Sequence, residues 1–227
     1  MNTWQEKLSL LKYRGGIEAA LFWLVKVLFK AEVYFFYAVD LSEESKASRA
    51  HGNNHKKNQF QFISLNTDQD LSAHPHDLIK LINAQSGWSV PRLIGKNAGV
   101  YALTQQGKVV TQTNISSNTV IEVDTPTDLN IHLDHKDVFL GYLYTYPEYR
   151  GKSAAAILLR KVCKAVFDRG YSRIVTHVRS TNIASLNTFR KCGWSRKGWI
   201  VTSLKGHLLL ACFPRKSTIK VSSRLSK

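Results

Sequence analysis

Acidic residues are scarce in the last third of the chain. Between residues 146 and 227 only Glu148 and Asp168 are acidic, against eighteen lysines and arginines. Residues 1–145 hold fourteen residues of each sign, so the whole net charge of +16 lies in the C-terminal part. Such a field attracts a polyanionic cofactor, nucleic acid, an acidic carrier protein or anionic lipid. The alternative is a basic surface that only keeps the protein in solution.

Cysteine is also rare, with three in 227 residues. Cys163, Cys192 and Cys212 are odd in number and widely spaced, and no C-x-x-C occurs. This pattern argues against a disulfide framework and favours a reducing compartment. The close histidine pairs lack a third ligand at metal-site spacing, so we expect no metal. With 44% hydrophobic and 21% charged residues, the chain is typical of a globular protein with a full core.

The chain lacks a long apolar run without charges. Residues 17–39 are long enough to cross a bilayer, which takes about 20 residues. Glu18, Lys26, Lys30 and Glu32 interrupt this segment, and each is costly at the membrane centre. The helical spacing of its apolar residues suits a helix packed on the domain or a helix lying in a membrane interface. We therefore expect a cytoplasmic protein without a cleavable signal, or one peripheral on the inner face of the membrane through this segment.

The pattern of apolar and turn residues divides the chain into three parts. We expect an N-terminal extension at 1–58, a domain at 59–213 and a basic tail at 214–227. The extension contains helices near 3–13 and 16–31, a strand at 33–39 and a polar linker at 41–58. In the domain we expect strands at 59–65, 100–104, 109–115, 120–123, 138–146 and 173–178, two strands flanking Lys205-Gly206, and helices at 76–84, 152–169 and 183–192. This order predicts a mixed α/β fold around one central sheet.

A turn between a strand and a helix carries the first functional signal. Residues 146–152 read Tyr-Pro-Glu-Tyr-Arg-Gly-Lys and lead into the helix expected at 152–169. A helix begins with unpaired N–H groups and the positive end of its dipole, which attract phosphate. Gly151 lets a ligand approach the backbone closely. The turn is therefore a candidate phosphate site.

A second motif specifies the ligand. The loop Arg150-Gly-Lys-Ser-Ala-Ala155 is followed, about thirty residues after the turn, by Asn182-Ile-Ala-Ser-Leu-Asn-Thr-Phe-Arg-Lys-Cys-Gly-Trp194. Together they resemble the GCN5-related N-acetyltransferase (GNAT) superfamily, which carries an Arg/Gln-x-x-Gly-x-Gly/Ala loop and later Asn-x-x-Ala/Ser. The resemblance covers 137–213 by motif and 59–136 by strand order. It implies a central, mostly antiparallel twisted sheet flanked by helices, with an N-terminal helical extension.

The resemblance also implies acetyl-CoA as co-substrate. Loop amides would bind its pyrophosphate, a strand end would pair with its pantetheine arm, and an asparagine would hydrogen-bond that arm. The residues implied are Leu143, Thr145, Arg150, Gly151, Lys152, Ser153, Ala154, Ala155, Asn182 and Phe189. Two of them depart from the family pattern. Ser153 replaces the first loop glycine, although serine tolerates helical backbone angles, and Phe189 replaces a common tyrosine that protonates the departing thiolate.

Transfer of an acetyl group to an amine needs a base for the amine proton and a proton donor. The resemblance indicates Asp137, at the start of the strand before the loop, as the base, and capping of a turn is its alternative role. Tyr144 shares one face of that strand with Tyr142 and Tyr146, which makes it a candidate donor. Ordinary packing is the alternative for these tyrosines.

We therefore expect an N-acetyltransferase that moves an acetyl group from acetyl-CoA to a primary amine. The acceptor is a small-molecule or lipid-linked amine, for which an aminosugar or envelope polysaccharide precursor is one hypothesis. Alternatives are an acyl carrier protein as donor, a non-catalytic CoA-binding protein, or a basic module for nucleic acid or membrane. Nucleic acid is disfavoured because the basic residues are not interleaved with aromatics as in RNA-reading sheets.

Overall fold

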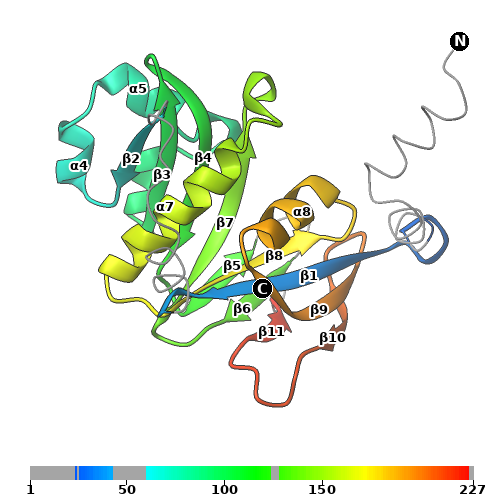
Figure 1. Cartoon of the computed structure of the whole chain (residues 1–227). Coiled ribbons are helices and arrows are strands. Elements are labelled where there is room, and N and C mark those ends of the chain that lie inside the picture. The colour runs from blue at the N-terminus through cyan, green and yellow to red at the C-terminus, as the bar shows by residue number, and fades with distance from the viewer. Residues whose placement is uncertain (1–23, 25, 43–59, 124–127, 225–227) are drawn as a thin grey trace, which may run out of the picture. The chain divides into compact units, whose positions relative to one another are not determined.

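The structure is a computed structural model that describes residues 24, 26–42, 60–123 and 128–224 (Figure 1). The strands are β1 (Ala31–Asp40), β2 (Gln61–Leu65), β3 (Ala98–Gln105), β4 (Lys108–Ser116), β5 (Val120–Val123), β6 (Leu129–His132), β7 (Asp137–Thr145), β8 (Arg173–Arg179), β9 (Ser195–Ser203), β10 (Leu208–Cys212) and β11 (Lys220–Ser223). The helices are α4 (Asp68–Ser72), α5 (His76–Leu81), α6 (Val90–Ile94), α7 (Ala154–Asp168) and α8 (Ile183–Lys191), with 3₁₀ turns η1 (Ala84–Ser86) and η2 (Pro147–Tyr149). The helix predicted at 3–13 and most of the linker predicted at 41–58 lie outside the described residues.

The chain forms two compact units. The first comprises the described residues within 1–38, 120–133 and 177–227, and the second comprises those within 39–119 and 134–176. Strand β8 begins in the second unit and ends in the first. The mixed α/β class is confirmed, with a large, mostly antiparallel sheet flanked by helices. None of the described helices is long and apolar enough to cross a membrane.

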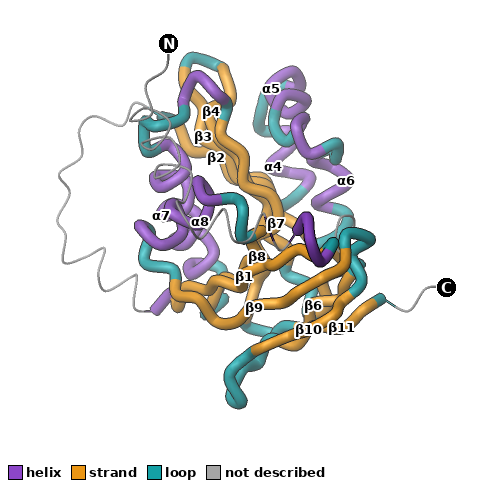
Figure 2. Tube along the Cα trace, turned by 90° about the vertical axis from the view of Figure 1, so that its right-hand side faces the viewer, coloured by secondary structure: helices purple, strands orange, loops and turns teal. Residues whose placement is uncertain are grey.

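In the second unit, the strand order is β8-β7-β4-β3-β2. Strands β7 and β8 pair in parallel, whereas β7–β4, β4–β3 and β3–β2 are antiparallel. Figure 2 shows α7 on one face of β2, β3 and β4, and α4, α5 and α6 on the other. The predicted hairpin is confirmed: β3 and β4 are joined by Gln106 and Gly107, whose φ angles of 50° and 75° suit a two-residue turn.

Helix α7 packs on the sheet through the side chains that its sequence predicts. Leu158, Leu159, Val162 and Val166 are each at most 1% exposed. The helix ends before Gly170, which has a φ of 89°, as expected for a helix stop. This packing fixes the position of the helix N-terminus, where the candidate phosphate turn lies.

In the first unit, β1 is an internal strand. It pairs antiparallel with β9, from Ala31 opposite Ser203 to Ala38 opposite Ser195. On its other side, the Ser180 N–H donates to the Val33 carbonyl at 2.8 Å. The strand predicted at 33–39 is therefore confirmed. Its side chains are almost all buried, so the interpretation of 17–39 as a membrane-contacting segment is wrong for this part of it.

A second, three-stranded sheet has the order β11-β6-β5 and belongs to the first unit. Strand β5 was predicted in the central sheet, and β6 and β11 were not predicted. Residues 220–223 of the expected basic tail form strand β11 and pair with β6, with most of their side chains exposed. Arg224 supports this sheet through an ion pair of 2.7 Å with Glu122 on β5.

Candidate functional site

The turn before α7 takes an unusual backbone path. Strand β7 ends at Thr145, η2 follows, and the loop then passes through Gly151 and Ser153 with φ angles of 76° and 61°. Glycine adopts such left-handed angles readily, whereas for an L-amino acid they raise the conformational energy by about 1–2 kcal/mol. Ser153 therefore carries a backbone strain that a glycine at this position would not.

The N-terminus of α7 is open to a ligand. The helix has 15 residues, no acidic residue in its first turn and no side-chain cap from Ser153. Its first N–H groups have no partner within the helix, and they carry the positive end of the dipole. Gly151, Lys152 and Ser153 are exposed, whereas Ala154 is 2% exposed. The loop thus exposes main-chain N–H groups and positive charge at the start of a helix whose position is fixed by packing in the core.

The side chain of Arg150 folds back on the strand instead of extending from the loop. Its Nε donates to the Thr145 carbonyl at 3.1 Å, and its guanidinium carbon lies 5.8 Å from the centre of the Tyr144 ring. Lys152 has its Nζ 5.5 Å from the Tyr149 ring and projects from the loop itself. Arg150 and Lys152 are both exposed, but Arg150 is bonded to the strand end, whereas Lys152 lies against the loop's own Tyr149.

One edge of β7 is paired with a neighbouring strand over only part of its length. Strand β8 pairs with β7 only from Asp137 to Phe139. Just beyond, Thr176 Oγ1 donates to the Leu140 carbonyl at 2.8 Å. The rest of β7 continues as a partner of β4 alone among the described strand pairs.

Hydrogen bonds show which residues of β7 face β4. The N–H of Tyr142 donates to Asn114 Oδ1 at 2.7 Å, and the Tyr144 carbonyl accepts from Thr111 Oγ1 at 2.9 Å. Because neighbouring residues of a strand direct their main-chain groups to opposite edges, those of Leu143 and Thr145 face the other edge. These are the two residues predicted to pair with an extended arm of a cofactor.

The side chain of Asn114 on β4 replaces a main-chain hydrogen bond between β4 and β7 at this point. The register between β4 and β7 shifts between Thr113 and Ile115, where Gly141 and Tyr142 of β7 lie opposite Asn114, and this marks a bulge in β7. A Cβ on Gly141 would lie 2.6 Å from Asn114 Oδ1, so only glycine leaves room for this amide. Sequence reasoning missed Asn114 and Gly141, although a polar residue and a glycine within apolar strands are signals of a bulge.

The three tyrosines of β7 form one aromatic row. The Tyr142 and Tyr144 rings are stacked with centres 6.0 Å apart, and the Tyr144 and Tyr146 rings meet edge to face at 5.2 Å. Burial raises the pKa of Tyr142, and the neighbouring tyrosines raise it further. Tyr144 thus lies between two rings, with the guanidinium of Arg150 nearby.

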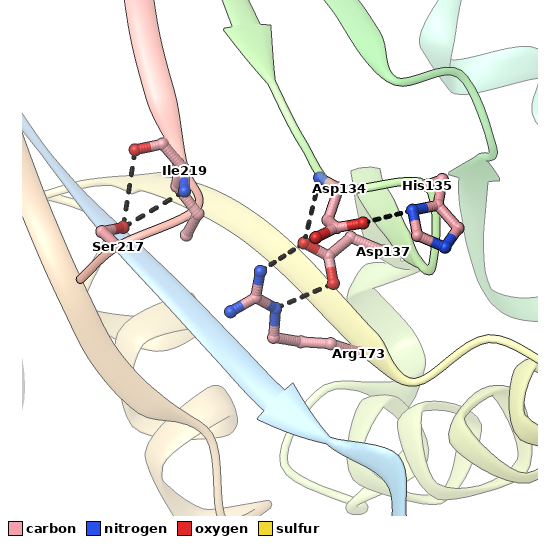
Figure 3. Close-up of polar contacts among 6 residues, drawn as sticks. All are labelled: Asp134, His135, Asp137, Arg173, Ser217 and Ile219. Atoms are coloured by element: carbon pink, nitrogen blue, oxygen red, sulfur yellow. Dashed lines mark hydrogen bonds and ion pairs between the residues drawn. The ribbon is translucent and has the colours of Figure 1, made fainter.

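Asp137 lies at the start of β7 in an ion pair (Figure 3). Arg173 Nε donates to its Oδ1 at 2.9 Å, and another guanidinium nitrogen contacts its Oδ2. The Asp134 N–H also donates to Oδ2, at 3.4 Å. Asp137 is 4% exposed, so this carboxylate is buried with both oxygens engaged. The partner Arg173 was not identified from the sequence.

The residues predicted from the second motif lie on α8, in the first unit. Asn182 is the N-cap of α8 and its side-chain oxygen accepts from the Ser185 N–H at 3.2 Å. Phe189 is 2% exposed and packs against Trp194, with ring centres 4.8 Å apart. The structure brings together Leu143, Thr145 and the loop in the second unit, and Asn182 with Phe189 on one helix in the first.

A charged cluster on β1 was also missed. The buried carboxylate of Glu32 accepts from Tyr34 Oη at 2.8 Å and contacts Lys26 at 2.6 Å and Arg179 at 3.2 Å. Burial acts to raise the pKa of Glu32, but these partners outweigh it and the pKa is lowered. Burial and the bond to Glu32 raise the pKa of Tyr34 to about 12. The carboxylate of Glu32 is thus fully paired within an ion-pair network. Separately, within the described residues no group of three His, Cys, Asp or Glu side chains is placed to hold a metal.

The chain matches one family of known proteins. Residues 62–194 match the model of the acetyltransferase (GNAT) family, whereas no curated protein matches the chain. Among solved structures, the chain is similar to a GNAT-family acetyltransferase from Novosphingobium aromaticivorans, at 14% identity and a TM-score of 0.46. That likeness covers 86% of this chain and 66% of the other, so the chain spans slightly less than two thirds of that protein.

Two other solved structures are aminoglycoside acetyltransferases. One, in complex with CoA, has 13% identity, a TM-score of 0.44 and coverage of 60% of this chain and 91% of that one. The other, from an uncultured soil metagenomic sample and in complex with trehalose, has 13% identity, a TM-score of 0.42 and coverage of 61% and 90%. The family match includes the loop before α7 and the Asn182–Trp194 motif, and it spans more than half of the chain. This chain belongs to the GNAT acetyltransferase family.

Proposed function

We propose that this protein transfers an acetyl group from acetyl-CoA to a primary amine. The observation that carries the proposal is the open N-terminus of α7, where the left-handed Gly151 and Ser153 expose loop amides next to the end of β7. Coenzyme A is a polyanion with a long amide-bearing arm. Such a ligand needs a cradle of N–H groups for phosphate and an edge of main-chain groups for the arm.

The proposed cofactor contacts divide by chemistry. The main-chain N–H groups of Gly151 to Ala155 bind the pyrophosphate, and Lys152 adds a positive charge. Leu143 and Thr145 pair with the pantetheine arm through the edge of β7 that has no strand partner among the described residues beyond Phe139. On the first unit, Asn182 and Phe189 are proposed as further cofactor contacts. Arg150 contributes charge when it leaves the Thr145 carbonyl, and otherwise it holds the loop against the strand.

The proposed chemistry starts with attack of a neutral amine on the thioester carbonyl. Asp137 is proposed as the group that takes the amine proton, directly or through water, which requires that one of its oxygens be released from Arg173. Tyr144 is proposed as a donor to the carbonyl oxygen, where negative charge develops. The tyrosine row also offers flat apolar surface on which an acceptor can rest.

We further propose that the acceptor is a neutral or anionic aminosugar precursor. The net charge of +16 repels a polycation, whereas a phosphate-bearing or neutral amine approaches without that penalty. The basic C-terminal part also suits an acidic acyl carrier protein as an alternative donor. Both ideas rest on charge alone, and a screen of amines and donors tests them.

The first experiment is thermal stabilisation by acetyl-CoA, CoA, an acyl carrier protein and DNA, each added separately. A ligand that binds the folded state raises the Tm, by an amount equivalent to about 2.7 kcal/mol at one hundred times the Kd. We expect acetyl-CoA and CoA to raise the Tm and DNA to leave it unchanged. Absence of a shift with either CoA form contradicts the proposal, and a shift with the carrier protein alone favours the alternative donor.

Matched charge variants locate the cofactor on the loop. Lys152→Ala removes one exposed cation of the loop, and Arg150→Ala removes the other together with its contact to Thr145. Arg160→Ala removes an exposed cation further along α7 and serves as the control. The first two variants should weaken CoA binding about tenfold, since a charge-assisted contact contributes about 1.5–3 kcal/mol. An equal effect of the Arg160 variant would mean that the field of the chain, not the loop, binds the cofactor.

A further inference from the structure

A tyrosine hydroxyl from the N-terminal strand lies against helix α8. The Tyr37 ring is nearly parallel to that of Phe189, at 21°, with centres 6.5 Å apart. Tyr37 is 2% exposed, and both residues belong to the first unit. They are 152 positions apart in the sequence, so no local motif connects them.

The alternation of side chains along β1 places Tyr37 toward α8. The register shift between β1 and β9 at this point comes from the extra residue Lys197 on β9. Tyr34 and Phe36 both contact the ring of His177, at 5.5 and 5.9 Å, and therefore share one face of the strand. Tyr37 lies on the opposite face with Phe189.

The hydroxyl of Tyr37 is held by Arg190, the residue that follows Phe189. Arg190 Nε donates to the Tyr37 oxygen at 3.1 Å. A guanidinium has donors only, so the phenol acts as acceptor in this bond and its own proton is not used in it. Tyr37 thus has a fixed oxygen and a proton to donate.

The proposed reaction needs such a proton. When the carbon–sulfur bond of the tetrahedral adduct breaks, its electron pair moves to sulfur and leaves a thiolate, whose ordinary pKa is about 8.5. Near neutral pH this sulfur takes up a proton, and a positioned donor makes that step faster. Phe189 has no hydroxyl to give one.

We propose that Tyr37 is the catalytic residue that protonates the departing CoA sulfur. The phenol proton moves to sulfur as the carbon–sulfur bond breaks, which yields the free thiol, and the Tyr37 phenolate beside Arg190 then regains a proton from water. The inference rests on the proposed function, because it takes Asn182, at the start of the same helix, to guide the pantetheine arm along α8. Tyr37 then supplies from β1 what Phe189 lacks.

A ligand-and-variant cycle tests this without an acceptor. The affinities of CoA and of desulfo-CoA, which lacks the sulfur, are measured by calorimetry for the original protein, Tyr37→Phe, Phe189→Tyr and the double variant. A hydrogen bond from Tyr37 to sulfur should make CoA bind about threefold to tenfold more tightly than desulfo-CoA. Tyr37→Phe should abolish this preference, and Phe189→Tyr in the same chain should restore it.

Tyr34→Phe is the matched control, since Tyr34 is a buried tyrosine of the same strand that bonds Glu32 instead. It should lower the Tm and leave the preference for CoA intact. Cleavage of acetyl-CoA by water, followed as free thiol, should fall about tenfold to a hundredfold in Tyr37→Phe with an unchanged KM. An unchanged preference in Tyr37→Phe overturns the inference while CoA binding still stands. If the original protein does not bind CoA at all, the proposed function is overturned and the inference with it.

Discussion

Replacing Asp137 by alanine is expected to lower the free energy of unfolding by about 3 kcal/mol, because it breaks a largely buried ion pair with Arg173. The side chains of Asp137 and Arg173 are 5% and 19% exposed, and they are joined by two nitrogen–oxygen contacts. Removing one partner of a buried pair costs about 3–5 kcal/mol. The partial exposure of Arg173 places this pair at the lower end of that range.

The pair also joins strands β7 and β8, so the stability effects of changing Asp137 and Arg173 should depend on each other. Asp137 and Arg173 are directly opposite in the parallel pairing of β7 with β8. The double variant Asp137→Leu with Arg173→Met buries apolar groups of similar size, and it should lose less than the sum of the single variants. A coupling of about 2 kcal/mol or more is expected from the double-mutant cycle for groups in direct contact.

Thermal unfolding followed by circular dichroism is the assay. For a chain of this length 1 kcal/mol corresponds to about 2–4 °C, so Asp137→Ala should lower the Tm by about 6–12 °C. A loss below 2 °C would refute the reasoning. Asp137→Asn keeps the shape and part of the hydrogen bonding. If it retains the Tm but loses turnover of acetyl-CoA, the carboxylate acts in the chemistry; loss of both assigns it to the fold.

Variants at three further positions test the backbone and the half-buried His177. Ser153→Gly should raise the Tm by up to about 6 °C, since it removes a left-handed strain of about 1–2 kcal/mol at an entropic cost of about 0.5–1 kcal/mol, and Ser153→Ala should not. Gly141→Ala should lower the Tm and weaken CoA binding measured by calorimetry, because its Cβ would lie 2.6 Å from Asn114 Oδ1. Burial lowers the pKa of His177 to about 4, so the unfolded chain binds its proton first and stability should fall as the pH drops from about 6.5 to 4. His177→Phe should flatten the Tm against pH over that interval.

The elements with local signals were predictable from the sequence. The loop around Gly151 and the apolar stripe of α7 are contained in about twenty consecutive residues, and helix dipole and glycine chemistry act within that distance. The hairpin at Gly107 and the strand at 33–39 are local in the same sense. The left-handed angle of Ser153 was not predictable, since serine rarely takes it and the surrounding structure must hold it there.

Features that depend on pairing between distant segments were not predictable. Strands β6 and β11 are four residues long, and their alternation is too short to separate them from loops. The partner of Asp137 is 36 positions away, at Arg173. A single sequence shows that a carboxylate starts a strand, but it does not show which cation the neighbouring strand brings to it.

Strand β1 has a local signal that was predictable and a distant pairing that was not. Its run of buried side chains is typical of a strand covered on both faces, and such a strand belongs inside a sheet, because an edge strand would expose this surface and its unpaired main-chain groups. The residues that match the GNAT family begin at 62, after β1, yet β1 pairs with β9 and contributes the ring that packs on Phe189. A contiguous motif cannot include a residue from such a strand. A departure from the family pattern at Phe189 is therefore best interpreted together with what the fold places beside it, and here that neighbour is a tyrosine.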